Sequence, residues 1–230
     1  MKKYEEIALD LQKKINKKEF TMKLPTEDQL IHTYQVSRNT IRNAINSLVK
    51  IGIVYPIQGS GMFIRPPKKE NAICLNGTRG ITVDSPSKEI STQVLELKII
   101  NADEKLSQSF HCDIGTPIYY IERLRFRDNQ PFAIEYTYYN KDIIPYIGRE
   151  IAEKSIYRYI KEDLKLTFGF SDKYLKVIKL NERDSSLLQL ENGDPGLEIE
   201  DHVYLNNGQI FNISHIRYNY KLGYFYVSSI

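Results

Sequence analysis

Apolar residues recur every three or four positions in three stretches of the first fifty residues, as one face of an α-helix requires. These stretches predict helices over residues 4–17, 27–34 and 38–51. The second and third predicted helices are separated only by a short turn at Gln35-Val36. Two helices joined in this way predict a helix-turn-helix.

Polar residues at the predicted helix ends support these boundaries. Thr26 precedes the second helix and Gln29 follows three residues later, which predicts a capping box. Ser37 is placed to cap the third helix, and Gly52 is placed to end it in the left-handed conformation. We therefore expect this part of the chain to form compact helices with defined ends.

The start of the third helix carries side chains suited to reading DNA. Arginine can donate two hydrogen bonds to guanine, asparagine can pair with adenine, and the N–H groups of a helix N-terminus favour a phosphate. The candidate residues are Arg38, Asn39, Thr40, Arg42 and Asn43. An ordinary polar helix face would present the same residue types, so the pattern alone leaves both interpretations open.

A β-hairpin is predicted next, with strands over residues 53–57 and 62–64. Its tip contains Gly59, Ser60 and Gly61, and glycine allows positive φ angles with little bulk. Such a tip can press against the minor groove or the phosphates. Taken alone, it is equally compatible with a plain tight hairpin.

The rest of the chain contains an internal repeat with an offset of about 80 residues. Strand-like stretches over residues 94–100 and 174–180 are each followed by a short helix, a Gly-x-Pro turn and a hairpin. Asn101 and Asn181 are the expected caps of the two short helices.

We expect a helix over residues 151–164 to join the two repeats and a last strand over residues 224–229. The predicted fold class is α+β. It consists of an N-terminal winged helix-turn-helix and a larger domain with a mainly antiparallel sheet, whose helices pack on one face.

The first hairpin of the repeat places Arg123 and Arg125 on one face of a strand, because side chains alternate with a period of two. The matching positions of the second repeat are Asp201 and Val203, so the arginine pair belongs to one half only. Two adjacent guanidinium groups can bind a phosphate or a carboxylate. A solvated strand face is the alternative.

Charge is divided unevenly along the chain. Residues 1–70 carry 13 Lys and Arg against 7 Asp and Glu, a net charge of +6, whereas residues 71–230 carry 19 against 22, a net charge of −3. The asymmetry favours a polyanionic partner for the first part only. Cys74 and Cys112 lie far apart without metal-ligand spacing, and no apolar run is long enough for a signal peptide or a membrane span.

Three N-terminal motifs together resemble the GntR family of bacterial regulators. They are Leu24-Pro25-Thr26-Glu27, Val36-Ser37-Arg38-Asn39-Thr40-Ile41-Arg42 and Gln58-Gly59-Ser60-Gly61-Met62-Phe63-Ile64. The resemblance implies DNA contacts by Arg38, Thr40 and Arg42, with Gly61 at the wing. The full set of expected DNA-binding residues is Thr26, Arg38, Asn39, Thr40, Arg42, Asn43, Gly59, Ser60 and Gly61.

One position departs from the GntR pattern. Many members have a DNA-contacting arginine after the glutamate of the first motif, where this chain has Asp28. A carboxylate near phosphates should repel them, so we expect base reading to rest more heavily on Arg42.

The C-terminal part resembles the effector domain of the HutC subfamily, termed UTRA, whose fold is similar to chorismate lyase. The resemblance rests on Glu122-Arg123-Leu124-Arg125-Phe126, on Gln130-Pro131-x-x-Ile134-Glu135 and on Ser155-Ile156-Tyr157. It implies that a small-molecule site is lined by Arg123, Arg125, Glu135, Ser155 and Tyr157. The chain departs from the pattern at Lys221-Leu222-Gly223, where members often carry an acidic residue.

These expectations define three segments: a DNA-binding domain over residues 1–66, a linker over residues 67–74 and an effector domain over residues 75–230. We expect a cytoplasmic homodimeric repressor of a metabolic operon. It would bind a palindromic double-stranded operator under the control of a small anionic metabolite such as a phosphorylated sugar. No catalytic residues, metal, cofactor or membrane contact are expected.

Two other functions compete with this one. A lyase-like enzyme is possible in principle, but His111, His202 and His215 have no convincing catalytic partners in the sequence. An architectural DNA-binding protein without a ligand is the other alternative, and ligand-independent melting would favour it.

Overall fold

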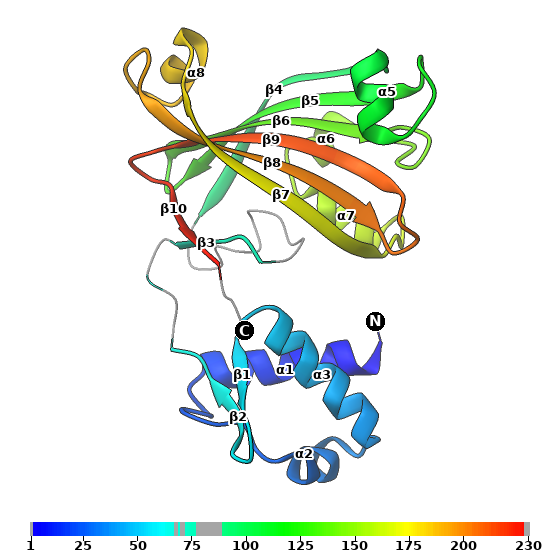
Figure 1. Cartoon of the computed structure of the whole chain (residues 1–230), viewed down its shortest axis with the longest axis vertical. Helices are drawn as coiled ribbons and strands as arrows, with labels where there is room; N and C mark the ends of the chain where they lie inside the picture. Colours follow the sequence, from blue (N-terminus) through cyan, green and yellow to red (C-terminus); the bar gives the residue numbers. More distant parts are fainter. Residues whose placement is uncertain (1, 67–68, 70–71, 77–88, 228–230) are drawn as a thin grey trace. The chain divides into compact units, whose positions relative to one another are not determined.

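The computed structural model describes residues 2–66, 69, 72–76 and 89–227. It divides into two compact units, residues 1–77 with 226–230, and residues 78–225 (Figure 1). The expected linker over residues 67–74 includes positions 67, 68, 70 and 71, which lie outside the described residues. The three proposed segment boundaries therefore stay predictions.

Three helices and a two-stranded hairpin make up the first unit. The elements are α1 (Lys3–Asn16), α2 (Glu27–Tyr34), α3 (Arg38–Lys50), β1 (Val54–Ile57) and β2 (Gly61–Ile64). Their apolar faces share one core, because the periodic residues predicted from the sequence all point inward. The buried core residues are Ile7, Ala8, Leu11, Leu24, Leu30, Ile41, Ala44, Ile45, Leu48 and Val54.

The helix ends confirm the predicted caps. Thr26 Oγ1 accepts a hydrogen bond from the backbone N–H of Gln29, and the Gln29 side chain accepts one from the N–H of Thr26. Ser37 Oγ accepts from the N–H of Thr40. Gly52 follows α3 with φ of 69°, so the helix ends in the left-handed conformation that glycine adopts without steric cost.

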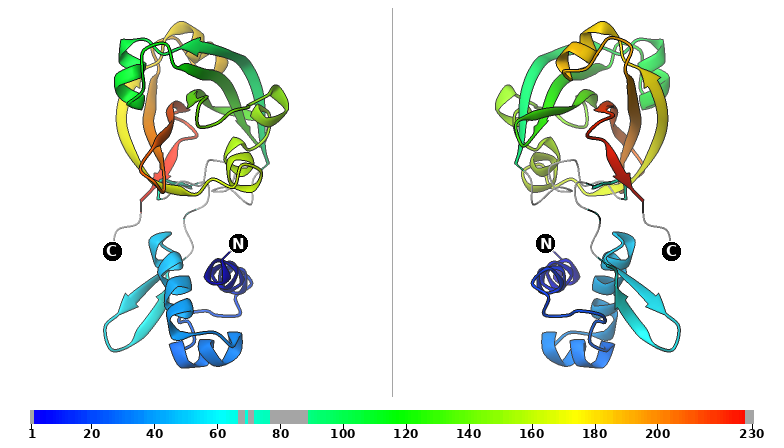
Figure 2. Two further views of the ribbon diagram at one scale, coloured as in Figure 1. Left: turned by 90° about the vertical axis from the view of Figure 1, so that its right-hand side faces the viewer. Right: turned by 90° about the vertical axis from the view of Figure 1, so that its left-hand side faces the viewer.

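A six-stranded antiparallel sheet forms the frame of the second unit, in the order β4-β5-β6-β9-β8-β7. The strands are β4 (Ile90–Asn101), β5 (Pro117–Arg127), β6 (Gln130–Asn140), β7 (Phe168–Lys179), β8 (Pro195–Leu205) and β9 (Ile210–Asn219). Each sequence repeat supplies three consecutive strands, and the two halves meet where β6 pairs with β9. This arrangement confirms the predicted repeat, and the sheet is strongly curved (Figure 2).

Helices cover both faces of this sheet, so the prediction of helices on one face was wrong. The short helices α6 (Arg149–Ala152) and α7 (Ile156–Glu162) pack on one face, hereafter the α6–α7 face. Helices α5 (Glu104–Phe110) and α8 (Glu182–Leu187) pack at opposite ends of the other face (Figure 1).

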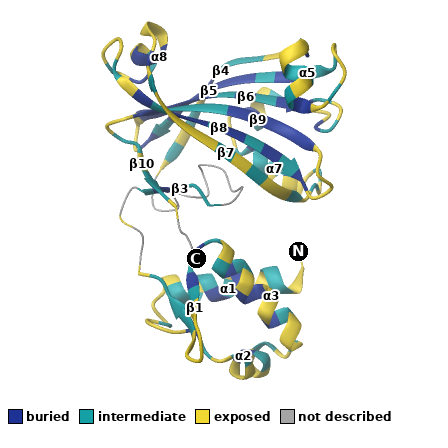
Figure 3. Cartoon of the chain, viewed as in Figure 1, coloured by how far each residue is buried: buried dark blue, intermediate teal, exposed yellow. Residues whose placement is uncertain are grey.

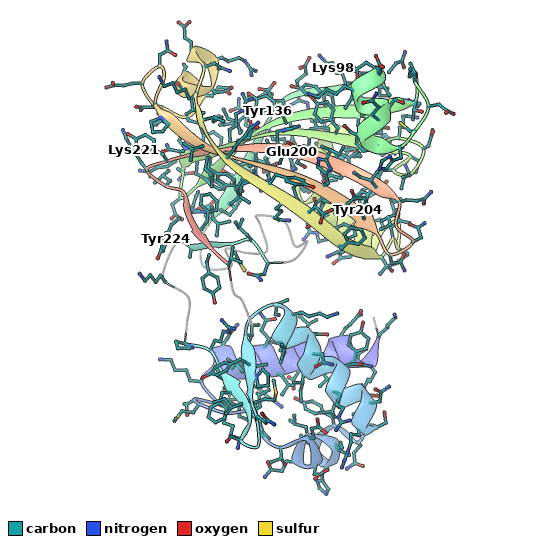
Figure 4. All side chains as sticks on the ribbon, in the orientation of Figure 1. Lys98, Tyr136, Glu200, Tyr204, Lys221 and Tyr224 are labelled. Carbon is teal, nitrogen blue, oxygen red and sulfur yellow. The ribbon has the colours of Figure 1, made fainter. Side chains whose placement is uncertain are left out.

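The reason is that the central strands carry buried apolar residues on both sides. Ile121 is buried on the α6–α7 face, whereas Ile118 contacts the cluster around α5 and Leu124 the cluster around α8. Figure 3 shows the resulting burial of β5, β6 and β9 and the exposure of the edge strand β7. The face with α5 and α8 also carries polar residues such as Tyr136 and Glu200 (Figure 4).

Three local predictions in the C-terminal part of the chain need correction. The single helix expected over residues 151–164 is two helices, because Ser155 has extended backbone angles and caps α7. Asp103 caps α5, while Asn101 stays in β4. The last strand is β10 (Tyr224–Tyr226), which pairs with β3 (Ala72–Cys74), and positions 228 and 229 lie outside the described residues.

None of the helices in the described ranges is long and apolar enough to cross a bilayer.

Candidate DNA interface and buried polar site

The predicted recognition residues lie on the solvent side of α3. Arg38, Asn39, Arg42 and Asn43 are exposed. Thr40 is half-buried, and its hydroxyl lies 2.9 Å from Ser37 Oγ, so it is engaged in the helix cap. The four exposed side chains are available to base edges and phosphates at the helix N-terminus.

Two ion pairs connect this surface to the start of α2. Arg38 Nη2 lies 2.6 Å from Asp28 Oδ1, and Arg42 Nε donates to both carboxylate oxygens of Glu27 at 3.0 and 3.1 Å. All four side chains are substantially exposed, and such pairs contribute about 0–1 kcal/mol. The two carboxylates therefore hold the guanidinium groups only weakly.

The sequence suggested that Asp28 would shift base reading toward Arg42. In the structure each of the two arginines is paired with an acidic residue of α2, so these ion pairs do not favour Arg42 over Arg38. The sequence analysis did not anticipate either pair, because the partners are 10 and 15 residues apart and belong to different helices.

The hairpin tip has the backbone that its glycines permit. Gly59 and Gly61 have φ angles of 73° and 101°, and Ser60 between them is exposed. A Cβ atom on Gly61 would lie 2.9 Å from Lys23 Cε. Lys23 is thus an additional cation beside the wing, and only its charge could have drawn attention to it in the sequence.

On the α6–α7 face, the structure brings Arg123, Arg125 and Glu135 into contact. Arg123 Nη2 lies 2.5 Å from Glu135 Oε2, and Arg125 Nη1 lies 3.0 Å from Glu135 Oε1. All three residues are buried, with exposed fractions of 7%, 4% and 4%. The alternative of a solvated strand face is therefore wrong for this arginine pair.

Burial and neighbouring charges shift the pKa values of Glu135 and Arg125 in opposite directions. Burial alone would raise the pKa of the Glu135 carboxyl, but the guanidinium groups of Arg123 and Arg125 hold that pKa below its ordinary value. Burial lowers the pKa of Arg125, and the Glu135 carboxylate opposes that shift. Glu135 is therefore the ionised counter-ion of both arginines.

Tyr157 reaches the same face from α7. Its hydroxyl donates to Asn212 Oδ1 at 2.8 Å, and Ser214 Oγ donates to the same oxygen at 3.2 Å. Burial raises the pKa of Tyr157 well above its ordinary value, with the charges of Asp201 and Glu135 adding to the shift. The Tyr157 hydroxyl is thus a neutral hydrogen-bonding group, and the charges of Glu135 and Arg123 affect its pKa.

Ser155 lies at the N-terminus of α7 and stabilises that helix end. Its Oγ accepts from the N–H of Arg158 and caps α7. Arg123 Nη1 donates to the carbonyl of Ala152 at 3.2 Å, which ties the arginine to the segment preceding Ser155. Within the described ranges, no group of three or more His, Cys, Asp or Glu side chains could hold a metal ion.

Comparison with known proteins finds two family models along the chain. The model described as "Bacterial regulatory proteins, gntR family" matches residues 3–64, and the model described as "UTRA domain" matches residues 86–221. The two matches fall on the helix-turn-helix and on the six-stranded sheet.

Individual relatives agree with these matches. The chain is 34% identical to the uncharacterised HTH-type transcriptional regulator YydK of Bacillus subtilis, over 100% of this chain and 98% of that protein. The crystal structure of YydK superposes with a TM-score of 0.84 over 100% of both chains.

Two repressors are more distant relatives. The HTH-type transcriptional repressor NagR of Bacillus subtilis is 27% identical, over 83% of this chain and 78% of its own length. The mannosyl-D-glycerate transport/metabolism system repressor MngR of Escherichia coli is 28% identical, over 85% of this chain and 82% of its own length.

Proposed function

The chain belongs to the gntR family of bacterial regulatory proteins and carries a UTRA domain, and on that premise we propose that it represses a sugar-related operon under the control of an anionic metabolite. Members of this family are DNA-binding transcription regulators, and the chain is a regulator of this kind rather than an enzyme. The identity of the effector and its site are the parts that we propose.

The observation that carries the effector proposal is the convergence of two buried guanidinium groups on one carboxylate. Burying arginine is costly unless its donors are satisfied. Arg123 Nε is buried and has no hydrogen-bond partner among the described residues. A phosphate or carboxylate at this position would accept from Arg123 in the geometry that guanidinium favours.

The residues that we propose for effector binding are those implied by the sequence, namely Arg123, Arg125, Glu135, Ser155 and Tyr157. The name of one relative supports a sugar as the ligand's remaining part. MngR is named for mannosyl-D-glycerate, a sugar derivative that carries a carboxylate. A sugar phosphate or a comparable sugar acid would combine the anion with hydroxyl groups.

On the DNA side, we propose contacts by the exposed residues of α3 and by the wing. The contacting residues would be Thr26, Arg38, Asn39, Thr40, Arg42, Asn43, Gly59, Ser60 and Gly61. One recognition helix reads only a few base pairs, so we propose a cytoplasmic homodimer on a palindromic operator. The proposed segments are residues 1–66, 67–74 and 75–230.

A thermal-shift screen of the full chain tests the effector site. Hexose phosphates and sugar acids should raise the melting temperature in a concentration-dependent manner, because a ligand stabilises the state that it binds. Arg123→Ala should remove the shift, whereas the matched control Arg158→Ala, an exposed arginine of α7, should retain it. Equal shifts in Arg123→Ala and wild type would remove Arg123 from the site.

A further inference from the structure

The two edge strands of the six-stranded sheet differ in how their outer sides are protected. The strand order places β4 at one edge and β7 at the other. The register of β4 shifts between Val94 and Glu96, and the carbonyl of Val94 accepts a hydrogen bond from Arg149 Nη1 of α6 at 3.2 Å. Irregular strands and covering side chains are means by which proteins prevent an edge from pairing with another chain. The β4 edge is therefore protected.

Strand β7 is regular and open by comparison. Its pairing with β8 is continuous from Ser171 to Lys179, and within the described part of the chain no strand pairs with its other side. Tyr174, Leu175 and Val177 have exposed fractions of 60%, 48% and 78%, and Figure 3 shows the exposure of the whole strand. A long, exposed and partly apolar edge strand is a template for pairing with another strand.

Lysine on an edge strand usually discourages such pairing, but two lysines of β7 are engaged within the chain. Lys173 Nζ donates to both carboxylate oxygens of Asp201 at 2.9 Å, and only 17% of its side chain is exposed. Lys176 Nζ lies 2.9 Å from Glu198 Oε1, while 61% of its side chain is exposed. Lys173 therefore does not protect the edge, and Lys176 is accessible to a second carboxylate.

The sequence of β7 is complementary to itself in the antiparallel direction. If two copies pair about a twofold axis at Tyr174, Asp172 of each copy lies opposite Lys176 of the other copy. Asp172 is exposed and has no ion-pair partner among the described residues. An axis at Asp172, at Lys173 or at Lys176 would instead place two like charges opposite each other. Charge therefore favours the register centred on Tyr174.

Both faces of the paired strands would make contacts in this register. Asp172, Tyr174 and Lys176 share one face of β7, because side chains alternate with a period of two. Opposite residues of an antiparallel pair have Cβ atoms about 4.5–5.5 Å apart, which is close enough for an ion pair. On the other face, the Leu175 side chains of the two copies are diagonal neighbours, about 7–8 Å apart, and this distance allows apolar contact between them.

We propose that β7 is the surface through which two copies of this chain pair, with their sheets joined edge to edge in the register centred on Tyr174. This inference rests on the proposed homodimer and adds its interface and register. The interface is isologous, so each contact occurs twice. Two ion pairs between Asp172 and Lys176 and the backbone hydrogen bonds of the edge would hold the copies together.

Analytical ultracentrifugation of the full chain measures the Kd of the dimer. It is carried out at one low salt concentration, because salt screens exposed charges. Asp172→Lys places two ammonium groups opposite each other at both charged positions, and Lys176→Asp places two carboxylates there. Like charges directly opposite each other destabilise paired strands, so each variant should raise the Kd of the dimer by about tenfold or more.

A mixture of these two variants tests the register. In a mixed dimer, the lysine introduced in one copy lies opposite the aspartate introduced in the other copy, and the second pair consists of the original residues. Both pairs then have opposite charges. The mixed dimer should therefore have a Kd within about threefold of wild type, although each variant alone dimerises poorly.

Two further variants serve as a control and as a second test. Asp142→Lys makes the same charge change at an exposed carboxylate in the turn after β6, and it should leave the Kd of the dimer unchanged. Lys176→Asp also places a carboxylate beside Glu198, so its melting temperature is measured alongside. Leu175→Lys leaves the pair between Lys176 and Glu198 in place and faces Lys173 of the other copy, so it should also weaken the dimer by about tenfold.

The outcomes separate this inference from the proposed function. A wild-type dimer whose Kd is the same in Asp172→Lys and Leu175→Lys would overturn the β7 interface and leave the proposed homodimer in place. A mixture of the two folded charge variants that dimerises no better than either alone would overturn the register and with it the proposal. A wild-type chain that is monomeric at every concentration would contradict the homodimer and the β7 interface together.

Discussion

Arg38 and Asp28 form an ion pair of 2.6 Å between the N-terminal turns of α3 and α2. The resemblance of the first motif to the GntR pattern implies a DNA-contacting arginine at this position, where the chain has Asp28. Both side chains are exposed, so the pair restrains the Arg38 guanidinium without burying it. We infer that Asp28 orients the Arg38 side chain on the proposed DNA-binding surface of the protein. Its carboxylate also reduces the net positive charge of that surface.

Replacing Asp28 should therefore strengthen non-specific DNA binding. Asp28→Asn removes one negative charge, and we expect higher affinity for random duplex DNA and a salt dependence steeper by about one charge. Fluorescence anisotropy over a series of salt concentrations measures both. The melting temperature should hardly change, because exposed ion pairs contribute little. Weaker binding of random DNA by Asp28→Asn would contradict this inference.

Arg42→Ala should reduce sequence discrimination. If Arg42 contacts a base edge, the variant loses about 1–3 kcal/mol of binding free energy on a DNA site selected from a random library. It loses less binding free energy on unrelated DNA. Lys105→Ala, an exposed lysine of α5, is a control of similar charge change. An equal loss of affinity on selected and unrelated DNA would make Arg42 a phosphate contact instead.

Thr26→Ala should destabilise the first unit. The variant removes the hydroxyl that accepts from Gln29 N, and N-cap losses of this kind cost about 1 kcal/mol. Thr26→Ser should retain most of the stability, because serine caps equally well. Hydrogen exchange of the α2 amides measures the local effect, and identical protection in all three proteins would rule out a capping contribution.

Glu135 should make the second unit sensitive to acid. Its pKa lies below the ordinary value of 4.5, because the charges of Arg123 and Arg125 together outweigh the increase that burial would cause. A carboxyl whose folded-state pKa is depressed contributes stability above its unfolded pKa, and that stability is lost as the pH falls through the folded value. We expect urea midpoints to decrease below about pH 4.5 through this group.

Glu135→Gln tests that assignment. The amide cannot ionise, so the variant should be less stable at neutral pH and should lose less stability on acidification than wild type. Removing one partner of a buried ion pair typically costs about 3–5 kcal/mol. Equal acid sensitivity of the two proteins would assign the effect to other carboxyl groups.

The first unit could be predicted in detail because its signals are local. The capping box at Thr26, the cap at Ser37 and the glycine after α3 each act within a few residues, so the sequence contains both partners. The ion pairs of Arg38 and Arg42 could not be predicted in the same way, because they depend on how α2 and α3 cross.

The buried site was predicted in part. Period two placed Arg123 and Arg125 on one face correctly, but their burial depends on α6 and α7, which the sequence showed as one longer helix. The two-residue turn at Asp128-Asn129 pairs Arg127 with Gln130, and the register shift between Arg125 and Phe126 then sets Glu135 opposite Arg123. The contact between the two halves of the sheet requires the β6–β9 pairing, which no local pattern specifies.

Operator affinity with and without an effector tests the central claim most directly. The full chain is titrated at fixed salt onto a selected operator duplex by fluorescence anisotropy, alone and with an anionic sugar that calorimetry shows to bind. We predict that the Kd for DNA changes by about fivefold or more in wild type and not in Arg123→Ala. An unchanged Kd in wild type with every ligand that binds would contradict the account.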